Sequence, residues 1–342
     1  MKSIALAPSG GKGFVPRLVE SDEPSPAKGE LTVSMAACGL CGTDVEKVRG
    51  EYTASMPVIG HEAVGMVKET NEARGFVRGD RVFPHHHVPD YSCGLCKAGN
   101  ETMCDHYRAS NLRPGGFAEV FAVPAWNLDR GGVLKLPDTM GFEVASLIEP
   151  LACCIRAIRK CHVEPGESAL VAGAGPVGMM HALLMKTVGT KVVLSDVSPD
   201  RLRFAEKAEA GRVVDAKGDV PAAVKSETEG KGVDVAIVAS GNRGAILQGL
   251  RSIRKGGRVC LFGVPLKGTV LEYDIGDLYN SEQEIMTSYG ATETDTKAAL
   301  KVLSARGDEF GKLVTHRFPL SRFDEAMAAA VGGTGMKVVV TP

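Results

Sequence analysis

Three closely spaced cysteines are the first residues whose types and spacing could do chemistry. Two residues separate Cys93 from Cys96, and seven separate Cys96 from Cys104. A closed zinc site needs four ligands, and the same three-residue interval points back to Asp90. A carboxylate oxygen can complete a tetrahedral site, although it is a harder ligand than a thiolate. We expect a structural zinc site that includes Asp90. The alternatives are a three-cysteine site with water and a lobe without metal.

A second set of possible metal ligands is spread along the chain. Cys41 lies in CGLCGTD, His61 and Glu62 lie in GHE, and Glu149 lies in LIEPLACC. A thiolate, an imidazole and one or two carboxylates can bind zinc and leave a position open for a substrate, as a catalytic site requires. No local spacing links the three segments. The alternatives are a buried free thiol for Cys41 and surface charges for the two glutamates.

The stretch VAGAGPVG places Gly173, Gly175 and Gly178 in a G-x-G-x-x-G pattern. Such glycines permit a tight turn, a close approach of pyrophosphate to the backbone, and close packing of a helix on a strand. The N-terminus of the helix then presents unpaired N–H groups to the phosphates. Asp196 follows 18 residues after Gly178, at the end of the next expected strand, where a carboxylate can bind an adenosine ribose. These residues predict a dinucleotide site.

The cofactor expected at this site is NAD, because the carboxylate of Asp196 would repel the 2′-phosphate of NADP. Nearby Arg201 and Arg203 could still admit a phosphate, so NADP is the alternative cofactor. A glycine turn that serves only helix packing is the alternative to a cofactor site.

The elements that must position these residues change in kind along the chain. Up to about residue 148, short β-like runs are broken by Gly and Pro, which is typical of a mostly antiparallel domain; these runs are 30–38, 62–69, 80–89 and 117–124. After Pro165, strands and helices alternate. The expected strands are 168–175, 191–196, 211–216, 233–240, 257–263 and 284–289, and the expected helices are 176–189, 199–210 and 243–255. This alternation predicts a doubly wound parallel α/β sheet.

The tail of the chain returns to β-like runs, at 312–320 and 337–341, around a helix at 321–330. We therefore expect residues 1–148 and 297–342 to form a catalytic domain with a metal lobe at about 87–107. Residues 149–296 are expected to form an inserted dinucleotide-binding domain.

The overall composition excludes some classes of function. A length of 342 residues is sufficient for two domains with a core each. A net charge of −1 gives no reason to expect a nucleic-acid partner. The sequence contains no apolar stretch near the roughly 20 residues of a membrane span. Nine cysteines without an export signal favour reduced thiols in the cytoplasm over disulfides.

Several motifs occur in the order seen in zinc-dependent medium-chain alcohol and polyol dehydrogenases: ACGLCGTD, GHEAVGMV, GDRV, the cysteine-rich lobe, GGFAEV, IEPLAC and GAGPVG. The resemblance covers essentially the whole chain and looks closest to the sorbitol/iditol and threonine dehydrogenase branch. In that branch a glutamate in an EPL segment stands where simple alcohol dehydrogenases have a second cysteine. The resemblance implies a Rossmann domain inserted in a mostly β, GroES-like catalytic domain with a zinc lobe. It also implies a homodimer or homotetramer.

Two zinc ions per chain follow from the resemblance. Cys41, His61 and either Glu62 or Glu149 would bind the catalytic zinc. The structural zinc would bind in the lobe. The family pattern has four cysteines there, and this chain has an aspartate in place of the first cysteine. The ligands would be Asp90, Cys93, Cys96 and Cys104.

The resemblance also implies roles beside the catalytic zinc. Thr43 would carry the alcohol proton away, and Asp44 would orient the imidazole of His61. Turn capping is the alternative role for this pair. NAD would contact the glycine turn, the acidic residue and two later segments, through Gly173, Gly175, Pro176, Val177, Gly178, Asp196, Arg201, Ser240, Phe262, Gly263 and Val264.

The implied reaction is reversible hydride transfer to NAD⁺ from a secondary alcohol that is a polyol or sugar alcohol. Threonine, glucose and simple-alcohol dehydrogenases of the same superfamily are the alternatives. A dinucleotide-binding protein without hydride chemistry, or a zinc-free quinone reductase, should have lost the catalytic ligands, and this chain keeps all four.

The run His85–His87 and the other cysteines receive structural interpretations. The run is expected within a strand, where neighbouring side chains point to opposite faces. One of the histidines in the substrate cleft is the alternative. Small core residues are expected at Cys38, Cys153, Cys154, Cys161 and Cys260.

Overall fold

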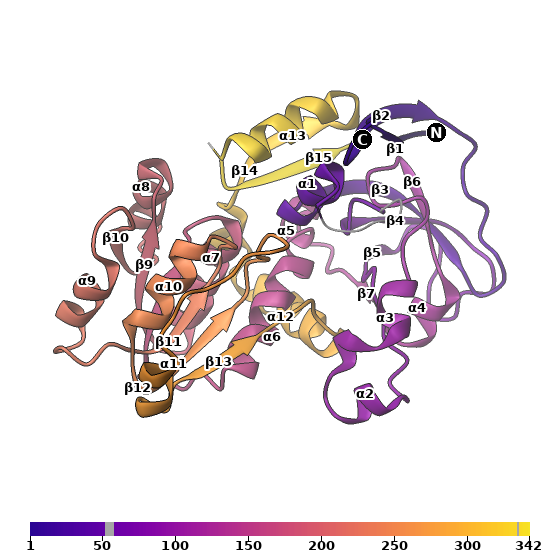
Figure 1. Cartoon of the computed structure of the whole chain (residues 1–342). Coiled ribbons are helices and arrows are strands. Elements are labelled where there is room, and N and C mark those ends of the chain that lie inside the picture. Colours follow the sequence, from indigo (N-terminus) through magenta and orange to yellow (C-terminus); the bar gives the residue numbers. More distant parts are fainter. Residues whose placement is uncertain (52–57, 334) are drawn as a thin grey trace. The chain divides into compact units, whose positions relative to one another are not determined.

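The computed structural model describes residues 1–51, 58–333 and 335–342 (Figure 1). Its backbone divides into two compact units. The first unit comprises Met1–Ala152 and Ala291–Pro342, and the second comprises Cys153–Gly290. The chain therefore leaves the first unit once and returns to it near its C-terminus.

The centre of the first unit is a sheet with the strand order β14-β15-β3-β4-β5-β7, in which β6 also pairs with β3. Strand β3 (Leu31–Leu40) is largely buried and pairs antiparallel with β4 (Glu62–Thr70). Both ends of the chain build this sheet, because the yellow β15 (Lys337–Thr341) pairs with β3 (Figure 1). The other strands are β5 (Arg81–Pro84), β6 (Val120–Val123), β7 (Val133–Lys135) and β14 (Val314–Pro319), and β1 (Lys2–Pro8) and β2 (Phe14–Glu20) form a separate pair.

Helices of the first unit connect and cover these strands. α1 (Gly42–Arg49) begins directly after β3, and α13 (Phe323–Gly332) packs on β14 and β15. α12 (Glu293–Gly311) packs on α5 (Phe142–Ala145), and the boundary between the units falls within α6 (Ile148–Lys160). The remaining helices are α2 (Gly94–Lys97), α3 (Asp105–Ala109) and α4 (Ala125–Asp129), with 3-10 turns at Glu101–Met103 and Leu320–Arg322.

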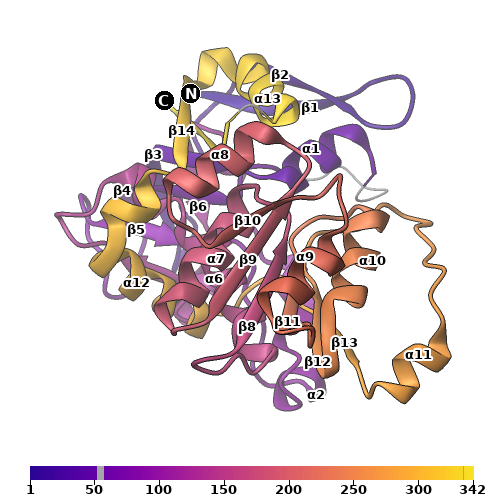
Figure 2. The same cartoon turned by 90° about the vertical axis from the view of Figure 1, so that its left-hand side faces the viewer.

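The second unit contains a six-stranded sheet with the order β10-β9-β8-β11-β12-β13, in which every neighbouring pair is parallel (Figure 2). α7 packs on β8 and β9, whereas α10 packs on β8, β11 and β12, and this cover explains the apolar central strands. The strands are β8 (Ser168–Ala172), β9 (Lys191–Asp196), β10 (Arg212–Asp215), β11 (Val233–Val238), β12 (Ile253–Leu261) and β13 (Glu284–Thr287). The helices are α7 (Pro176–Thr187), α8 (Pro199–Lys207), α9 (Val220–Glu227), α10 (Arg243–Ser252) and α11 (Ile275–Asn280).

The direction of strand addition reverses between β8 and β11, so the predicted doubly wound parallel sheet is confirmed. Doubly wound sheets bind ligands beyond the carboxyl ends of the strands at such a reversal. The glycine turn follows β8 directly and therefore lies at this position.

Two local predictions were wrong. The helix expected at 243–255 ends at Ser252, because Ile253 begins β12 and pairs with Val233 of β11. Pairing in the sheet outweighs the local helical pattern there. The strand expected at 80–89 ends at Pro84. His85–His87 therefore lie beyond the strand, and strand alternation does not decide where their side chains point.

Candidate active site and metal sites

Cys41, His61 and Glu62 come together within the first unit. Cys41 follows the last residue of β3, and His61 immediately precedes Glu62, the first residue of β4. Because Gly39 of β3 pairs with Glu62, the end of one strand meets the start of the other. One possible ligand atom from each of the three residues lies within 4.8 Å of the other two. Segments without any local spacing rule therefore form a single cluster.

Asp44 links two members of this cluster. Its buried carboxylate accepts hydrogen bonds from the backbone N–H of Gly60 at 3.1 Å and of Cys41 at 3.2 Å, and it lies 3.2 Å from Nδ1 of His61. Burial alone would raise the pKa of Asp44, but His61, Lys47 and the backbone N–H of Cys41 lower it overall. An ionised Asp44 accepts from Nδ1–H, so in the neutral ring of His61 the free lone pair is on Nε2.

Thr43 lies at the Nε2 side of the same imidazole. Its Oγ1 is 3.4 Å from Nε2 of His61. A hydroxyl can both accept and donate a hydrogen bond. The structure thus places a group capable of proton transfer beside the ring nitrogen that Asp44 leaves free.

Lys337 is a member of the site that the sequence analysis missed. It is the first residue of β15, its side chain is 4% exposed, and its Nζ lies 2.5 Å from both carboxylate oxygens of Glu62. A Cβ at Gly39 would come within 1.9 Å of Glu62 Oε2 and 2.9 Å of Lys337 Cε, so a larger residue there would displace the side chains of the pair. No sequence signal identified Lys337, because a lysine at the start of a C-terminal strand usually lies at the surface.

Glu149 is buried near the cluster and acts on it electrostatically. It is the second residue of α6 and is 6% exposed. Burial raises the pKa of Glu62, Lys337 and His61 oppose that rise, and Glu149 adds to it. Glu149 lies outside the group of three residues whose ligand atoms are within 4.8 Å of one another. The structure thus brings all four predicted ligands into one electrostatic environment.

The donor set of this cluster matches zinc. A thiol, an imidazole and a carboxylate are the ligands of catalytic zinc sites. Burial lowers the pKa of His61, yet Asp44 and Cys41 together raise it well above its usual value, which shows how strongly the cluster attracts positive charge. A bound cation would neutralise the negative charge of the cluster, and the imidazole could then remain neutral.

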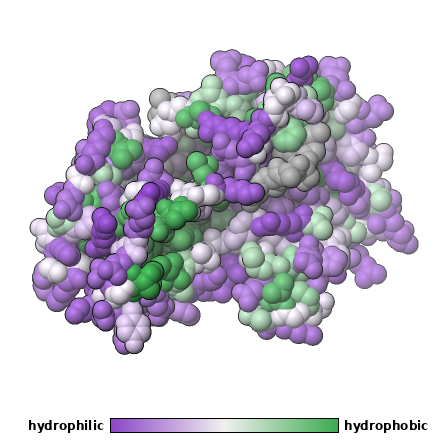
Figure 3. Space-filling view, viewed as in Figure 1, coloured by the Kyte–Doolittle hydropathy of each residue, from purple (hydrophilic) through white to green (hydrophobic). Residues whose placement is uncertain are grey.

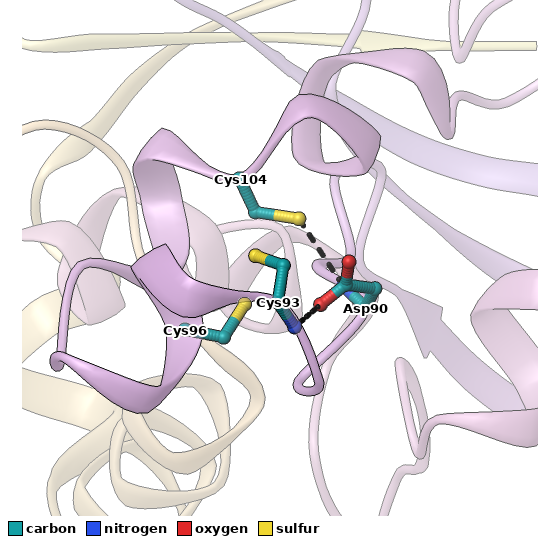
Figure 4. Close-up of side chains that lie close together, drawn as sticks. All are labelled: Asp90, Cys93, Cys96 and Cys104. Carbon is teal, nitrogen blue, oxygen red and sulfur yellow. Dashed lines mark hydrogen bonds between the residues drawn. The ribbon is translucent and has the colours of Figure 1, made fainter.

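The lobe brings Asp90, Cys93, Cys96 and Cys104 together, again with one ligand atom each within 4.8 Å of the others (Figure 4). Asp90 Oδ1 accepts hydrogen bonds from the backbone N–H of Ser92 at 2.7 Å and of Cys93 at 2.8 Å, and the backbone N–H of Asp90 donates to Cys104 Sγ at 3.4 Å. The two N–H donors lower the pKa of Asp90, so this carboxylate is ionised.

The lobe also has the chemistry of a metal site. Burial raises the pKa of Cys96 to about 12, and the neighbouring Cys93 and Asp90 contribute to the rise. A thiolate at Cys96 therefore needs a nearby cation, which a metal ion bound by the four residues would supply. A tetrahedral zinc site with bonds of about 2.3 Å would bring the sulfur atoms about 3.8 Å apart, which is compatible with ligand atoms that lie within 4.8 Å of one another.

The glycine turn has the geometry of a dinucleotide fingerprint. Gly173 has a φ of 111°, Gly175 caps α7, and Pro176 and Val177 form its first turn. A Cβ at Gly178 would lie 1.8 Å from the carbonyl oxygen of Gly173, so only glycine lets α7 approach β8 this closely. The first turn of α7 therefore presents free backbone N–H groups at the C-terminal end of β8.

Asp196 and Arg201 lie beside this turn. Asp196 ends β9, and its two oxygens accept hydrogen bonds from the backbone N–H of Ala174 at 2.7 Å and of Ser198 at 2.8 Å. Arg201 Nη1 is 3.6 Å from Asp196 Oδ2 and 3.7 Å from a Cβ built on Gly175. An acidic and a basic side chain thus share the place where an adenosine ribose would bind.

The two later segments of the predicted cofactor site also meet. A Cβ at Gly263 would come within 2.4–2.6 Å of the backbone of Ser240, and one at Gly241 would come within 2.0 Å of the Val264 carbonyl oxygen. These segments follow β11 and β12, at the carboxyl ends of the strands. Phe262 turns its ring toward His181 of α7, at 4.6 Å between ring centroids.

Comparisons with known proteins agree with these sites. The sequence matches the zinc-binding dehydrogenase family over residues 176–305 and the alcohol dehydrogenase GroES-like domain over residues 27–138. L-threonine 3-dehydrogenase of Chromobacterium violaceum is 30% identical over 95% of this chain and 96% of that protein. The chain belongs to the zinc-binding dehydrogenases.

Other relatives share its full length. Sorbitol dehydrogenase of Halalkalibacterium halodurans is 29% identical over 100% of this chain and 99% of that protein. A structure described as a zinc-binding dehydrogenase of Sinorhizobium meliloti, with NADP bound, has a TM-score of 0.88 and 28% identity, and the match covers 100% of this chain and 99% of that one. The predicted family and the predicted GroES-like and Rossmann folds are confirmed.

This zinc-binding dehydrogenase is an oxidoreductase that acts on CH–OH groups with zinc and a nicotinamide cofactor, as predicted. In the part of the chain that the structure describes, helices that combine the length and the apolarity needed to cross a membrane are absent.

Proposed function

We propose that this dehydrogenase reversibly oxidises a secondary alcohol of the polyol or sugar-alcohol class to the ketone, with transfer of hydride to NAD⁺ and release of a proton. The observation that carries the proposal is the convergence of Cys41, His61 and Glu62 within 4.8 Å, with His61 held by Asp44. Zinc bound there would supply a Lewis acid that lowers the pKa of an alcohol hydroxyl.

Each residue of the site has a proposed task. Cys41 and His61 hold the catalytic zinc together with Glu62 or Glu149. Asp44 keeps Nδ1 of His61 protonated and so directs Nε2 toward the metal. Thr43 relays the hydroxyl proton, because its Oγ1 can accept that proton while the hydroxyl passes on its own; its position 3.4 Å from Nε2 supports this role. All six residues belong to the first compact unit.

NAD is the proposed cofactor, bound at Gly173, Gly175, Pro176, Val177 and Gly178 and flanked by the segments that contain Ser240, Phe262, Gly263 and Val264. The ionisable Asp196 beside the turn supports NAD over NADP, because it would repel a 2′-phosphate. Arg201 shares that position and supports NADP as the alternative.

A second zinc is proposed in the lobe, on Asp90, Cys93, Cys96 and Cys104, for a total of two zinc ions per chain. The hydrogen bonds that keep Asp90 ionised support a carboxylate ligand in place of a fourth thiolate. The proposed domain division remains that of residues 1–148 with 297–342 and an inserted domain of 149–296.

A homodimer or homotetramer is proposed on the surface of the second unit. β13 is the last strand of its sheet, and the space-filling view shows apolar residues gathered on this unit (Figure 3). Exposed apolar side chains on β13 and in the segment that precedes it are Leu266, Val270, Ile275, Tyr279 and Ile285. Apolar surface beside an open strand edge supports pairing with a second copy. All nine cysteines lie in the described part of the chain and none forms a disulfide there, which supports a reducing, cytoplasmic location.

L-threonine 3-dehydrogenase is the second candidate function, because relatives with that name reach 30% identity over 95% of the chain. The test is NADH formation by the purified protein across polyols, sugars, L-threonine and short alcohols. The proposal expects the highest kcat/KM with a polyol. Preference for L-threonine would replace the proposal with the second candidate, and no turnover with any alcohol would contradict both.

A further inference from the structure

His86 is a buried histidine beside the catalytic cluster to which the proposed chemistry gives no task. It is 6% exposed, and its ring centroid lies 5.0 Å from that of His61. Its Nδ1 is buried and has no hydrogen-bond partner among the described residues. A buried polar atom without a partner destabilises the folded state, so such atoms usually meet a ligand, an ion or a water.

The neighbours of His86 separate it from the rest of the histidine run. His85 is held by a hydrogen bond of 2.7 Å between its Nδ1 and Glu293, which also contacts the hydroxyl of Tyr91. The ring contacts of His85 are with Phe83, His86 and Tyr107. His87 is partly exposed and contacts Tyr107. His86 is therefore the histidine of the run whose ring contacts a ring of the metal cluster.

His86 lies beside the metal cluster without joining it. The group of ligand atoms within 4.8 Å of one another consists of Cys41, His61 and Glu62 among the described residues. If the reacting oxygen of a substrate bound at a metal in this cluster, an imidazole just outside the cluster could contact a neighbouring substituent of that substrate. A neutral imidazole at this position offers one N–H donor and one lone pair.

We propose that His86 is a specificity-determining residue, which hydrogen-bonds the second hydroxyl of a vicinal diol whose first hydroxyl is oxidised. This inference rests on the proposed function and narrows its substrate class. A hydroxyl matches a neutral imidazole because each group both donates and accepts. An ammonium group, which can only donate hydrogen bonds, matches such a ring less well. A buried site built for a hydroxyl discriminates strongly against an analogue that lacks it.

The test compares three matched substrates, butane-2,3-diol, butan-2-ol and 3-aminobutan-2-ol, in the zinc- and NAD-dependent enzyme. The wild-type enzyme should prefer the diol over both analogues. His86→Phe keeps an aromatic ring and removes the hydrogen bonds, and it should lower the ratio of kcat/KM for diol over butan-2-ol about 10- to 100-fold. His86→Gln retains a donor and an acceptor and should recover part of that ratio.

Two controls separate recognition from damage to the fold. His181→Phe changes another buried histidine, whose ring contacts Phe262 in the second unit. It should leave the ratio of kcat/KM for diol over butan-2-ol unchanged. Elemental analysis should find the same zinc content in the His86 variants as in the wild type.

The outcomes distinguish this inference from the proposed function. An unchanged ratio in soluble, zinc-replete His86→Phe and His86→Gln overturns the inference and leaves the function intact. Loss of one zinc in both variants overturns it as well, because His86 would then be a metal ligand. A wild-type enzyme that oxidises none of the three substrates, nor any alcohol in the wider screen, contradicts the proposed function itself.

Discussion

Lys337 Nζ lies 2.5 Å from both carboxylate oxygens of Glu62, and the two side chains are 4% and 0% exposed. The pair joins the last strand of the chain to the strand that begins at the catalytic cluster. Burial would lower the pKa of Lys337, but Glu62 and Cys41 raise it overall, so the lysine is a cation in the folded protein. The C-terminal strand therefore supplies a fixed positive charge to one of the two possible glutamate ligands.

Removal of this lysine should leave an uncompensated buried carboxylate. Lys337→Met is expected to destabilise the protein by about 3–5 kcal/mol, as for other buried ion pairs that lose one partner. The double variant Lys337→Met with Glu62→Gln should lose much less free energy of unfolding than the sum of the losses of the two single variants, because neither charge then remains. Urea denaturation of the four proteins checks this, and additive losses would show that the pair is not coupled.

The lobe should depend on Asp90 for its metal. Asp90→Ala removes the proposed fourth ligand, and we expect one zinc per chain in place of two after dialysis against a chelator, together with a lower Tm. Asp90→Cys should bind the lobe zinc more tightly, since a thiolate is the softer ligand. The control is Asp105→Ala, which removes an exposed carboxylate from the first turn of α3. Equal zinc retention by Asp90→Ala and the control would exclude Asp90 as a ligand.

Cofactor preference should follow the two side chains beside the glycine turn. Asp196→Ala is expected to weaken NAD binding more than NADP binding, because the ribose loses its acceptor and the repulsion of a 2′-phosphate is removed. Arg201→Ala should weaken the binding of NADP more than the binding of NAD. Dissociation constants from NADH and NADPH fluorescence measure both effects. A parallel loss for both cofactors in Asp196→Ala would contradict the assignment of Asp196 to the ribose.

His181 should make the stability of the protein dependent on pH. Burial lowers its pKa from 6.5 to about 3, so between these values the unfolded chain binds a proton that the folded protein does not. Stability contributed by the neutral ring is thus present above pH 6.5 and falls with decreasing pH, by about 1.4 kcal/mol per pH unit. His181→Leu should flatten the pH dependence of the urea midpoint between pH 6.5 and 4.5. The exposed His162→Gln controls for the loss of one histidine, and an equal effect of both substitutions would contradict the interpretation.

The sequence predicted those parts of the protein in which local pattern and tertiary structure agree. The glycine turn, the strand that ends in Asp196 and the lobe ligands are each defined within about 20 residues, and each has the expected local geometry. The end of α10 was wrong because pairing of Ile253 with β11 is a tertiary effect.

The rest of the site depends on contacts between distant segments. Lys337 meets Glu62 across 275 positions of sequence, through the pairing of β15 with β3. His86 lies outside the strand in which it was expected, because that strand ends at Pro84. Neither position could be derived from spacing, and only the family resemblance linked Cys41, His61 and Glu149 before the fold was seen.

The central claim is that Cys41 and His61 hold a zinc ion on which alcohol oxidation depends. Zinc content and NADH formation should be measured together in the wild type, Cys41→Ser and Cys38→Ala. Cys38 is the control because it is a buried thiol of β3, the strand that Cys41 follows, and lies outside the cluster. We predict two zinc ions and full activity for the wild type, the same for Cys38→Ala, and one zinc, no turnover and undiminished NADH binding for Cys41→Ser. Two zinc ions or substantial turnover in Cys41→Ser would contradict the account.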